Sequence, residues 1–246
     1  MKNTVENNLE KWDSEHSWSK DGDEWSGQAR LCGQPYKLWK QSLVDTFIKA
    51  NISGEDTILE IGPGHGRWSK EIVDHCGQLI LVDLGPKCID FCRDLLQDKN
   101  NVQYRVNDGQ TLPEVDDSSV DFIWSYDAFV HMNRATIESY FGEIRRVLKP
   151  GRKAIIHHAG RRHAFLWLRF LRETGAFGSG IYKYLTVGRL KQHDGWRADV
   201  SRTLVRAIAK KQGLIVEDQV NTWGQQGEFG IPAFFDAITI LTKPGS

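Results

Sequence analysis

The chain has 246 residues, and its 32 Lys and Arg side chains balance its 32 Asp and Glu side chains. This balance gives no reason to expect nucleic acid or an acidic membrane surface as a partner. The amino terminus is polar, and no run approaches the roughly 18 apolar residues of a membrane span. We therefore expect one sizeable cytoplasmic domain without a membrane span.

Short β-rich runs alternate with helical patterns from residue 56 onward, which is typical of an α/β fold with a parallel sheet. In chain order, the predicted elements are a strand at 57–62, a helix at 66–76, a strand at 79–84, a helix at 88–98, a strand at 102–108, a strand with its exit loop at 120–129, a helix at 134–148, a strand at 152–160 and a helix at 201–213. Two last strands, at 214–220 and 234–243, follow without room for a helix between them. Because a parallel crossover needs about a dozen residues, we expect this pair to be antiparallel.

Two segments lie outside the alternation that fills the main domain, residues 56–246. Residues 1–55 form a predicted helical lid segment, in which Trp25 either contacts a ligand or packs in the core. Residues 163–200 are a predicted insertion that mixes basic and aromatic side chains. The insertion either faces a substrate or forms a homodimer contact through the apolar run 165–171. Both segments border the carboxyl edge of the predicted sheet, where open α/β sheets bind ligands.

Three glycines, Gly62, Gly64 and Gly66, follow the first predicted strand with single residues between them. Such a turn lets backbone N–H groups approach a ligand that a Cβ atom would exclude. The dinucleotide fingerprint would place its third glycine where this chain has Arg67, so the spacing argues against an NAD-dependent oxidoreductase. Glu60, two residues before the turn, suits a cationic ligand better than a pyrophosphate.

Acidic residues end the next two predicted strands. Asp83 lies 21 residues after Gly62, where a carboxylate accepts hydrogen bonds from both ribose hydroxyls. Asp108 ends the third strand and is placed to meet an adenine edge. A glycine turn followed by two acids at successive strand ends indicates a nucleoside ligand.

Five motifs resemble, in order and spacing, those of class I S-adenosylmethionine-dependent methyltransferases: LEIGPGHGRWS, LVDL, NDGQTLP, VDFIWSYDAFVHM and RRVLKPGRKAIIHHAG. The resemblance covers residues 56–160 closely and implies a seven-stranded Rossmann-like sheet with one antiparallel strand. It also implies that S-adenosylmethionine lies across the strand ends and leaves as S-adenosylhomocysteine. It implies Gly62, Gly64 and Gly66 around the methionine part, Asp83 at the ribose, Asp108 and Gly109 at the adenine, and Ser125 beneath the sulfonium. The other predicted cofactor-binding residues are Glu60, Leu84 and Trp25.

Methyl transfer to a hydroxyl needs a base, because the acceptor must lose its proton. Asp127 and His131 are four residues apart and share one face if a helix follows the fourth strand. His157 and His158 end the fifth strand and point to opposite faces, so one of them should face the cleft. These four residues are the candidate catalytic residues, with the carboxylate orienting a histidine.

The leading hypothesis is O-methylation of a small acceptor, a sugar or a glycosylated natural product, without nucleic acid as a partner. A divalent ion held by the Asp and His residues is possible but less favoured, because no dense carboxylate cluster accompanies them. N-methylation of a small amine or peptide and a non-catalytic cofactor-binding subunit remain as alternatives.

Overall fold

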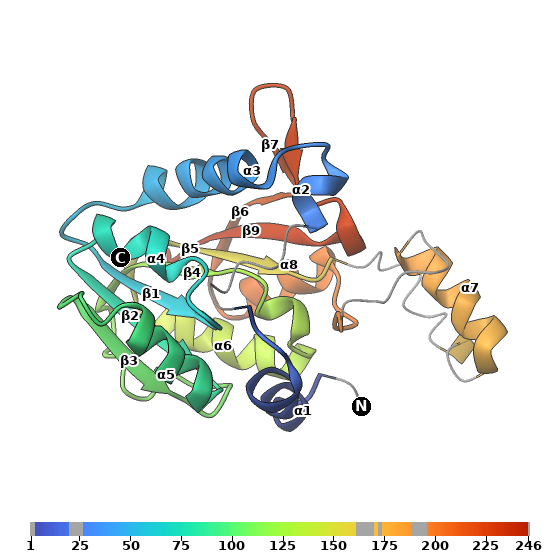
Figure 1. The fold of residues 1–246 in the computed structure, drawn as a ribbon, viewed down its shortest axis with the longest axis horizontal. Helices are drawn as coiled ribbons and strands as arrows, with labels where there is room; N and C mark the ends of the chain where they lie inside the picture. Colours follow the sequence, from blue (N-terminus) through green and yellow to red (C-terminus); the bar gives the residue numbers. More distant parts are fainter. Residues whose placement is uncertain (1–2, 20–26, 161–169, 172–173, 188–195, 246) are drawn as a thin grey trace.

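Seven strands form one sheet in the order β3-β2-β1-β4-β5-β9-β6 (Figure 1). The computed structural model describes residues 3–19, 27–160, 170–171, 174–187 and 196–245. The strands are β1 Thr57–Ile61, β2 Gln78–Asp83, β3 Val102–Val106, β4 Val120–Ser125, β5 Leu148–His158, β6 Ile215–Val220 and β9 Ala237–Thr242. The predicted seven-stranded, mostly parallel α/β sheet is therefore confirmed.

Strand β9 runs antiparallel to both of its neighbours. It pairs with β5 from Lys153 opposite Thr242 to His158 opposite Ala237, and with β6 on its other side. The residues just before β9 therefore lie at the sheet edge where β1, β2, β4 and β5 end. A small hairpin of β7 Thr222–Trp223 and β8 Phe229–Gly230 fills the connection between β6 and β9.

The helices that follow the strands begin where capping residues allow. Asn133 accepts a hydrogen bond from the Thr136 amide at the start of α6, and Ser201, where the predicted helix begins, caps α8 by accepting one from the Leu204 amide. The helix predicted at 66–76 is shorter, because the glycine turn extends to Trp68. The bounds are α4 Ser69–Ile72 with the 3₁₀ turn η4 Val73–His75, α5 Pro86–Leu95, α6 Arg134–Val147, α7 Gly175–Val187 and α8 Arg202–Lys211.

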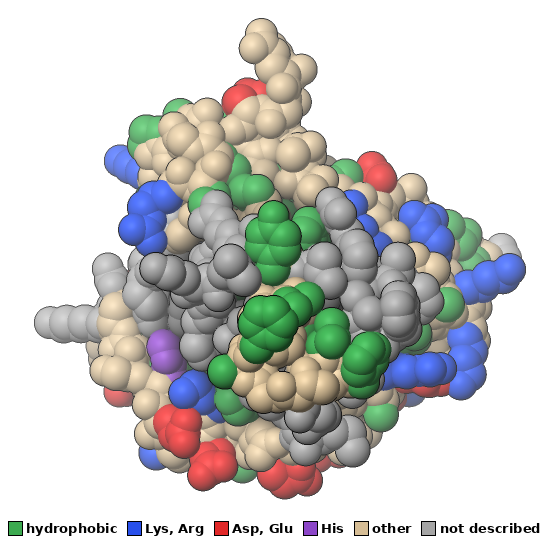
Figure 2. All heavy atoms as spheres, turned by 90° about the vertical axis from the view of Figure 1, so that its right-hand side faces the viewer, with side chains coloured by type: hydrophobic (Ala, Val, Ile, Leu, Met, Phe, Trp, Pro, Cys, Tyr) green, Lys and Arg blue, Asp and Glu red, His purple; other side chains and the backbone are tan. Residues whose placement is uncertain are grey.

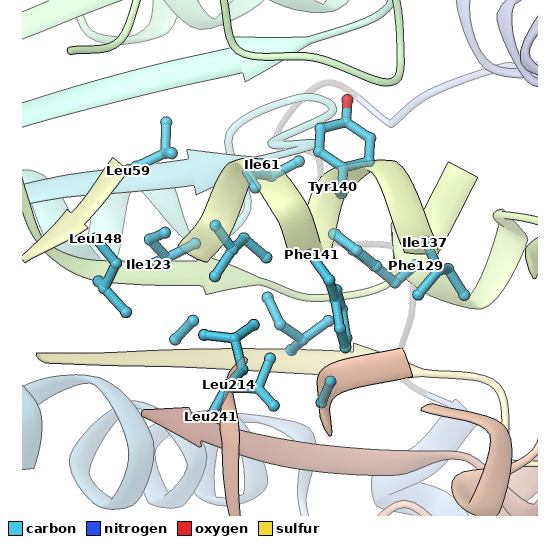
Figure 3. Packing of buried hydrophobic residues seen from close by; sticks show 14 of the residues in the cluster. Leu59, Ile61, Ile123, Phe129, Ile137, Tyr140, Phe141, Leu148, Leu214 and Leu241 are labelled. Atoms are coloured by element: carbon cyan, nitrogen blue, oxygen red, sulfur yellow. The ribbon is translucent and has the colours of Figure 1, made fainter. Parts of the chain in front are cut away.

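Each face of the sheet carries its own apolar core, because side chains alternate along every strand. Leu59 and Ile61 of β1 pack on one face with Phe141 of α6 (Figure 3). Ile58 of β1 packs on the other face with Trp39 of the amino-terminal segment. That segment comprises α1 Val5–Leu9, the π-helical turn η1 Glu10–Glu15, α2 Gly27–Leu31, α3 Tyr36–Leu43, a second π-helical turn η2 Val44–Ile48 and the 3₁₀ turn η3 Lys49–Asn51.

The predicted insertion at 163–200 is described in part. Its helix α7 lies to one side of the sheet (Figure 1) and faces the viewer in Figure 2. Phe177 and Tyr184 of α7 are exposed, by 83% and 55%, and Phe170 before it by 56%. Most of the run 165–171, a predicted dimer contact, lies outside the described residues. Within the part of the chain that the structure describes, no helix has the length and apolar character needed to cross a membrane.

Candidate active site

A cavity of about 780 Å³ lies at the carboxyl ends of the strands. The glycine turn and the end of β2 line one part of it, and the loop after β4 lines another. Residues from the amino-terminal segment and from Trp196 onward complete the wall. Its position is the edge at which open α/β sheets bind ligands, and its size is typical of small-molecule sites.

Gly62 and Gly64 line the cavity in left-handed backbone conformations, with φ of 72° and 55°. A Cβ atom on Gly62 would lie 2.5 Å from Cβ of Ala128, and one on Gly64 would lie 2.7 Å from the Trp18 ring. Side chains are thus excluded at both positions. Gly66 packs instead against Leu95 of α5, which places it outside the cavity lining of the described residues.

Asp83 faces the same part of the cavity as the glycine turn. Its carboxylate accepts hydrogen bonds from the amides of Gly64, at 3.1 Å, and Gly85, at 2.8 Å. Burial raises the pKa of Asp83 to about 6 despite these donors. Leu84 and Gly109 line the cavity beside it.

Three of the predicted cofactor residues lie behind or beside this surface. Glu60 is buried and accepts a 2.6 Å hydrogen bond from the Ser69 hydroxyl, and burial raises the pKa of Glu60 to about 8. Ser125 is also buried and donates to the Ile61 carbonyl at 2.6 Å. Asp108 is exposed and accepts from the amides of its own turn, so none of the three belongs to the described cavity lining.

A network of paired charges lies where the loop after β4 lines the cavity. Asp127 lies 3.0 Å from Arg67 Nη1 and 3.2 Å from His157 Nδ1. On the far side of the imidazole, Asp236 lies 3.4 Å from His157 Nε2 and 2.9 Å from Arg197 Nη2. Five segments far apart in sequence are therefore joined at one point.

The charges of this network fix the protonation of its members. Burial alone would raise the pKa of Asp127, but His157 and the two guanidinium groups hold it well below its ordinary value. Burial alone would lower the pKa of His157, but hydrogen bonds to Asp127 and Asp236 raise it above its ordinary value. Asp127 therefore remains an anion at the cavity wall.

His131 lines the cavity and is buried. Its Nδ1 lies 3.1 Å from the Trp196 carbonyl oxygen, and its ring lies 4.5 Å from the Trp12 ring. Burial and the charge of Arg197 lower the pKa of His131 to about 3. A neutral imidazole beside a carbonyl carries its proton on Nδ1, which leaves Nε2 as a hydrogen-bond acceptor.

The pairing of carboxylate and histidine differs from the predicted one. A 3₁₀ turn, η5 Phe129–His131, follows β4 in place of the α-helix that would align Asp127 with His131. Asp127 has a φ of 65°, and it contacts His157, 3.2 Å away. The hydrogen bonds of His158 go to the Ala159 carbonyl and the Thr239 hydroxyl, and neither adjacent histidine belongs to the described lining.

The segment 3–19, which we call the strap, covers the cavity from the glycine turn to His131. Trp18 stacks on His65, with ring centroids 4.5 Å apart. Asp13 accepts a hydrogen bond from the Lys87 amide, and Asn8 donates one to the His131 carbonyl. Trp25, the predicted lid residue, lies outside the described residues.

Backbone strain concentrates at the same part of the cavity as the charge network. Six described non-glycine residues have positive φ, and three of them, Asp127, Trp196 and Phe234, line the cavity. Such conformations cost about 1–3 kcal/mol each and cluster at functional sites. Because Asp236 follows this strained stretch and precedes an antiparallel strand, its position at this edge follows from the direction of β9.

The described residues contain no group of three or more His, Cys, Asp or Glu side chains placed to hold a metal ion. The positive partners of Asp127 occupy the place that a cation would take beside it.

Part of the chain is similar in sequence to known methyltransferases. Residues 58–151 match the family model described as a methyltransferase domain. Phosphoethanolamine N-methyltransferase 1 of Triticum aestivum is 30% identical over 112 residues, which are 42% of this chain and 22% of that protein. A probable ribosomal RNA small subunit methyltransferase A of Methanococcus aeolicus is 32% identical over 81 residues, 33% of this chain and 30% of that protein. The chain thus spans less than a third of either curated relative.

The fold extends beyond the matched segment. Geranyl diphosphate C-methyltransferase from Streptomyces coelicolor A3(2), solved with Mg²⁺, geranyl diphosphate and S-adenosyl-L-homocysteine, aligns with a TM-score of 0.64 and 14% identity. That alignment covers 97% of this chain and 98% of the other. Residues 58–151 thus resemble a methyltransferase domain, and the seven-stranded sheet that contains them has the Rossmann-like fold of class I methyltransferases.

Proposed function

We propose that the protein is a methyltransferase that uses S-adenosylmethionine to methylate a hydroxyl of a small acceptor. The observation that carries this proposal is the single cavity that joins the glycine turn and Asp83 to Asp127 and His131. Alignment of two reactants in one water-poor site supplies much of the rate of a bimolecular transfer.

The donor end of the cavity fits the cofactor. Gly62 and Gly64 leave backbone exposed where a Cβ atom would collide with neighbours, and Asp83 offers a carboxylate beside them. We assign Gly62, Gly64, Asp83, Leu84 and Gly109 to the donor, which supplies an activated methyl group when bound. Gly66, Glu60 and Ser125 support this surface from behind by packing and hydrogen bonding.

The acceptor end favours His131 as the base. It lines the cavity, and the Trp196 carbonyl orients its imidazole with Nε2 as the proton acceptor. A pKa of about 3 keeps that nitrogen unprotonated throughout the neutral range, and it also makes the imidazole a weak base, so the proposal requires that a bound acceptor raises this pKa. Asp127, held by Arg67 and His157, completes the polar wall around the acceptor.

The acceptor class that we propose is a sugar or a glycosylated natural product. A cavity of this volume suits a small molecule, and the zero net charge of the chain disfavours nucleic acid. The exposed side chains of α7, Phe177 and Tyr184, support a homodimer contact, which size-exclusion chromatography with light scattering would test.

N-methylation is the second candidate. The wheat relative is an N-methyltransferase by name, and the Asp127 carboxylate at the cavity wall could hold an ammonium group. An amine needs its own deprotonated form rather than a strong base, so this candidate makes His131 dispensable.

The test is mass-spectrometric detection of a methyl gain with S-adenosylmethionine and a panel of sugars, phenols and amines, each with and without a chelator. A methylated hydroxyl whose formation falls at least about a hundredfold in His131→Gln supports the proposal. The control is His75→Gln, at an exposed position on η4. Product with amines alone would favour the second candidate, and tight S-adenosylhomocysteine binding without any product would indicate a non-catalytic cofactor-binding subunit.

A further inference from the structure

The hydroxyl of Tyr126 is buried at the cavity wall and has no hydrogen-bond partner among the described residues. Buried polar groups almost always find a partner, and each exception needs an explanation. Tyr126 stands directly between Ser125, the last residue of β4, and Asp127 of the charge network. Tyr126 lines the same cavity as Asp127 and His131, the residues assigned above to the acceptor.

The Tyr126 ring is held firmly by other rings. It stacks on His157 with centroids 4.1 Å apart, and it lies 5.0 Å from Trp68 and 5.9 Å from Trp124. A ring fixed on several sides does not turn its hydroxyl to a distant partner. The packing of the Tyr126 ring therefore keeps its hydroxyl without a protein partner among the described residues.

The charges around the hydroxyl are already paired with one another. Arg67 is paired with Asp127 across 3.0 Å, and Arg197 with Asp236 across 2.9 Å. Asp236 Oδ1, a second buried atom of the same network, also has no hydrogen-bond partner within the described residues. The charged side chains of this wall are thus paired with one another, while some of its polar atoms have no hydrogen-bond partner in the described part of the chain. Such a wall suits a ligand group that is polar but uncharged.

We propose that Tyr126 determines acceptor specificity by donating a hydrogen bond to a neutral oxygen of the acceptor, a hydroxyl or carbonyl adjacent to the methylated position. This inference rests on the proposed function and adds the group that the acceptor must carry. The phenol is a donor because burial, with the nearby Asp127 carboxylate, holds its pKa well above the ordinary value. An acceptor without that oxygen would leave the buried hydroxyl unpaired, which costs affinity in the transition state.

The experiment compares wild type with Tyr126→Phe, which removes one oxygen atom. For the acceptor found in the panel, we expect kcat/KM to fall about tenfold or more in Tyr126→Phe. For the analogue that lacks the adjacent oxygen, both proteins should perform alike. Tyr104→Phe, on β3 and outside the described cavity lining, is the matched control and should match wild type on both acceptors.

Two further measurements separate this role from a structural one. The urea midpoint of unfolding and the affinity for S-adenosylhomocysteine should not fall in Tyr126→Phe, because no protein hydrogen bond is lost. Equal kcat/KM values on the full acceptor, or a lowered urea midpoint, would overturn the inference. A wild type that methylates nothing in the panel refutes the proposed function instead.

For such an inactive wild type, a crystal structure with S-adenosylhomocysteine decides the inference. An ordered water or ligand oxygen within hydrogen-bond distance of the Tyr126 hydroxyl supports it. A hydroxyl bonded to a protein group overturns it.

Discussion

Nη1 of Arg67 lies 3.0 Å from Oδ2 of Asp127, so a residue of the glycine turn holds a carboxylate of the acceptor end. The guanidinium is also enclosed by aromatic rings, with the Trp68 centroid 4.7 Å from its carbon and the Tyr36 hydroxyl 3.1 Å from Nε. The two ends of the cavity are therefore coupled through one buried ion pair.

Removing one member of this pair should destabilise the protein. For Arg67→Met we expect the free energy of unfolding to fall by about 2 kcal/mol, because the partly exposed Asp127 carboxylate loses one of its positive partners and keeps His157 and Arg197. Urea denaturation measures this change. Arg93→Met, which breaks the exposed pair of Arg93 and Asp90, should change it by less than about 1 kcal/mol. The double variant Arg67→Met/Asp127→Asn should lose less than the sum of the single losses, and strict additivity would show that the pair is not coupled.

The adjacent histidines of β5 should respond oppositely to pH. The raised pKa of His157 makes its contribution to stability fully present below the unfolded value of about 6.5 and lost as pH rises through the folded value. The pKa of His158 is lowered by burial to about 4, so His158 imposes a cost that grows as pH falls from about 6.5 to about 4.

Urea denaturation of His157→Gln and His158→Gln at about pH 5 and about pH 9 checks these signs. The stability lost in His157→Gln should be larger at the lower pH, and that lost in His158→Gln should be larger at the higher pH. The same pH trend in both variants would contradict the assignment of these two environments.

Asp83 and Asp108 should contribute differently to cofactor affinity. We expect Asp83→Asn to weaken S-adenosylhomocysteine binding by about tenfold to a hundredfold, because the carboxylate both lines the cavity and orders the Gly64 and Gly85 amides. Asp108→Asn should leave the affinity within about twofold, since its side chain bonds its own turn. Isothermal titration calorimetry gives both values, and a larger loss in Asp108→Asn would restore the sequence-based role of Asp108 at the adenine.

The contact between Trp18 and Gly64 makes a prediction about the strap. Gly64→Ala places a methyl group 2.7 Å from the Trp18 ring, whereas Gly151→Ala meets nothing within 4 Å at a similar positive φ. Both variants bear the left-handed backbone cost of about 1–2 kcal/mol, but only Gly64→Ala should lose a further 1–3 kcal/mol or so from overpacking. Adding Trp18→Ala should remove that extra loss, and equal stabilities of the two glycine variants would refute the contact.

The sequence predicts the sheet well because periodicity and turn residues act locally. The strands after residue 56, the helix start at Ser201 and the antiparallel final pair all follow from patterns within short windows. The lengths of helices are harder to predict. The helix after β1 starts late because Arg67 and Trp68 belong to the turn and its aromatic surroundings.

The site is less predictable because its contacts join distant segments. Strand ends locate Asp83, Asp127 and His131, but the choice of His157 as the partner of Asp127 depends on a positive φ that no pattern gives. Asp236 was not predicted, although its place before an antiparallel strand is a signal for this edge. Tyr126 lies within a recognised motif that implies no role for it, and Trp18 lies in none, so the roles of both follow only from packing.

Because β9 runs antiparallel to its neighbours, the carboxyl end of the chain lies far from the cavity, and this affects where a tag can be attached. Residues 243–245 follow a strand that runs away from the cavity, so an affinity tag or surface linkage attached there starts at the opposite edge of the sheet. Asn3 hydrogen-bonds the Trp196 carbonyl, so an attachment before it starts beside the ligand. Immobilisation through the carboxyl end thus keeps the attachment away from the strap during ligand-binding measurements.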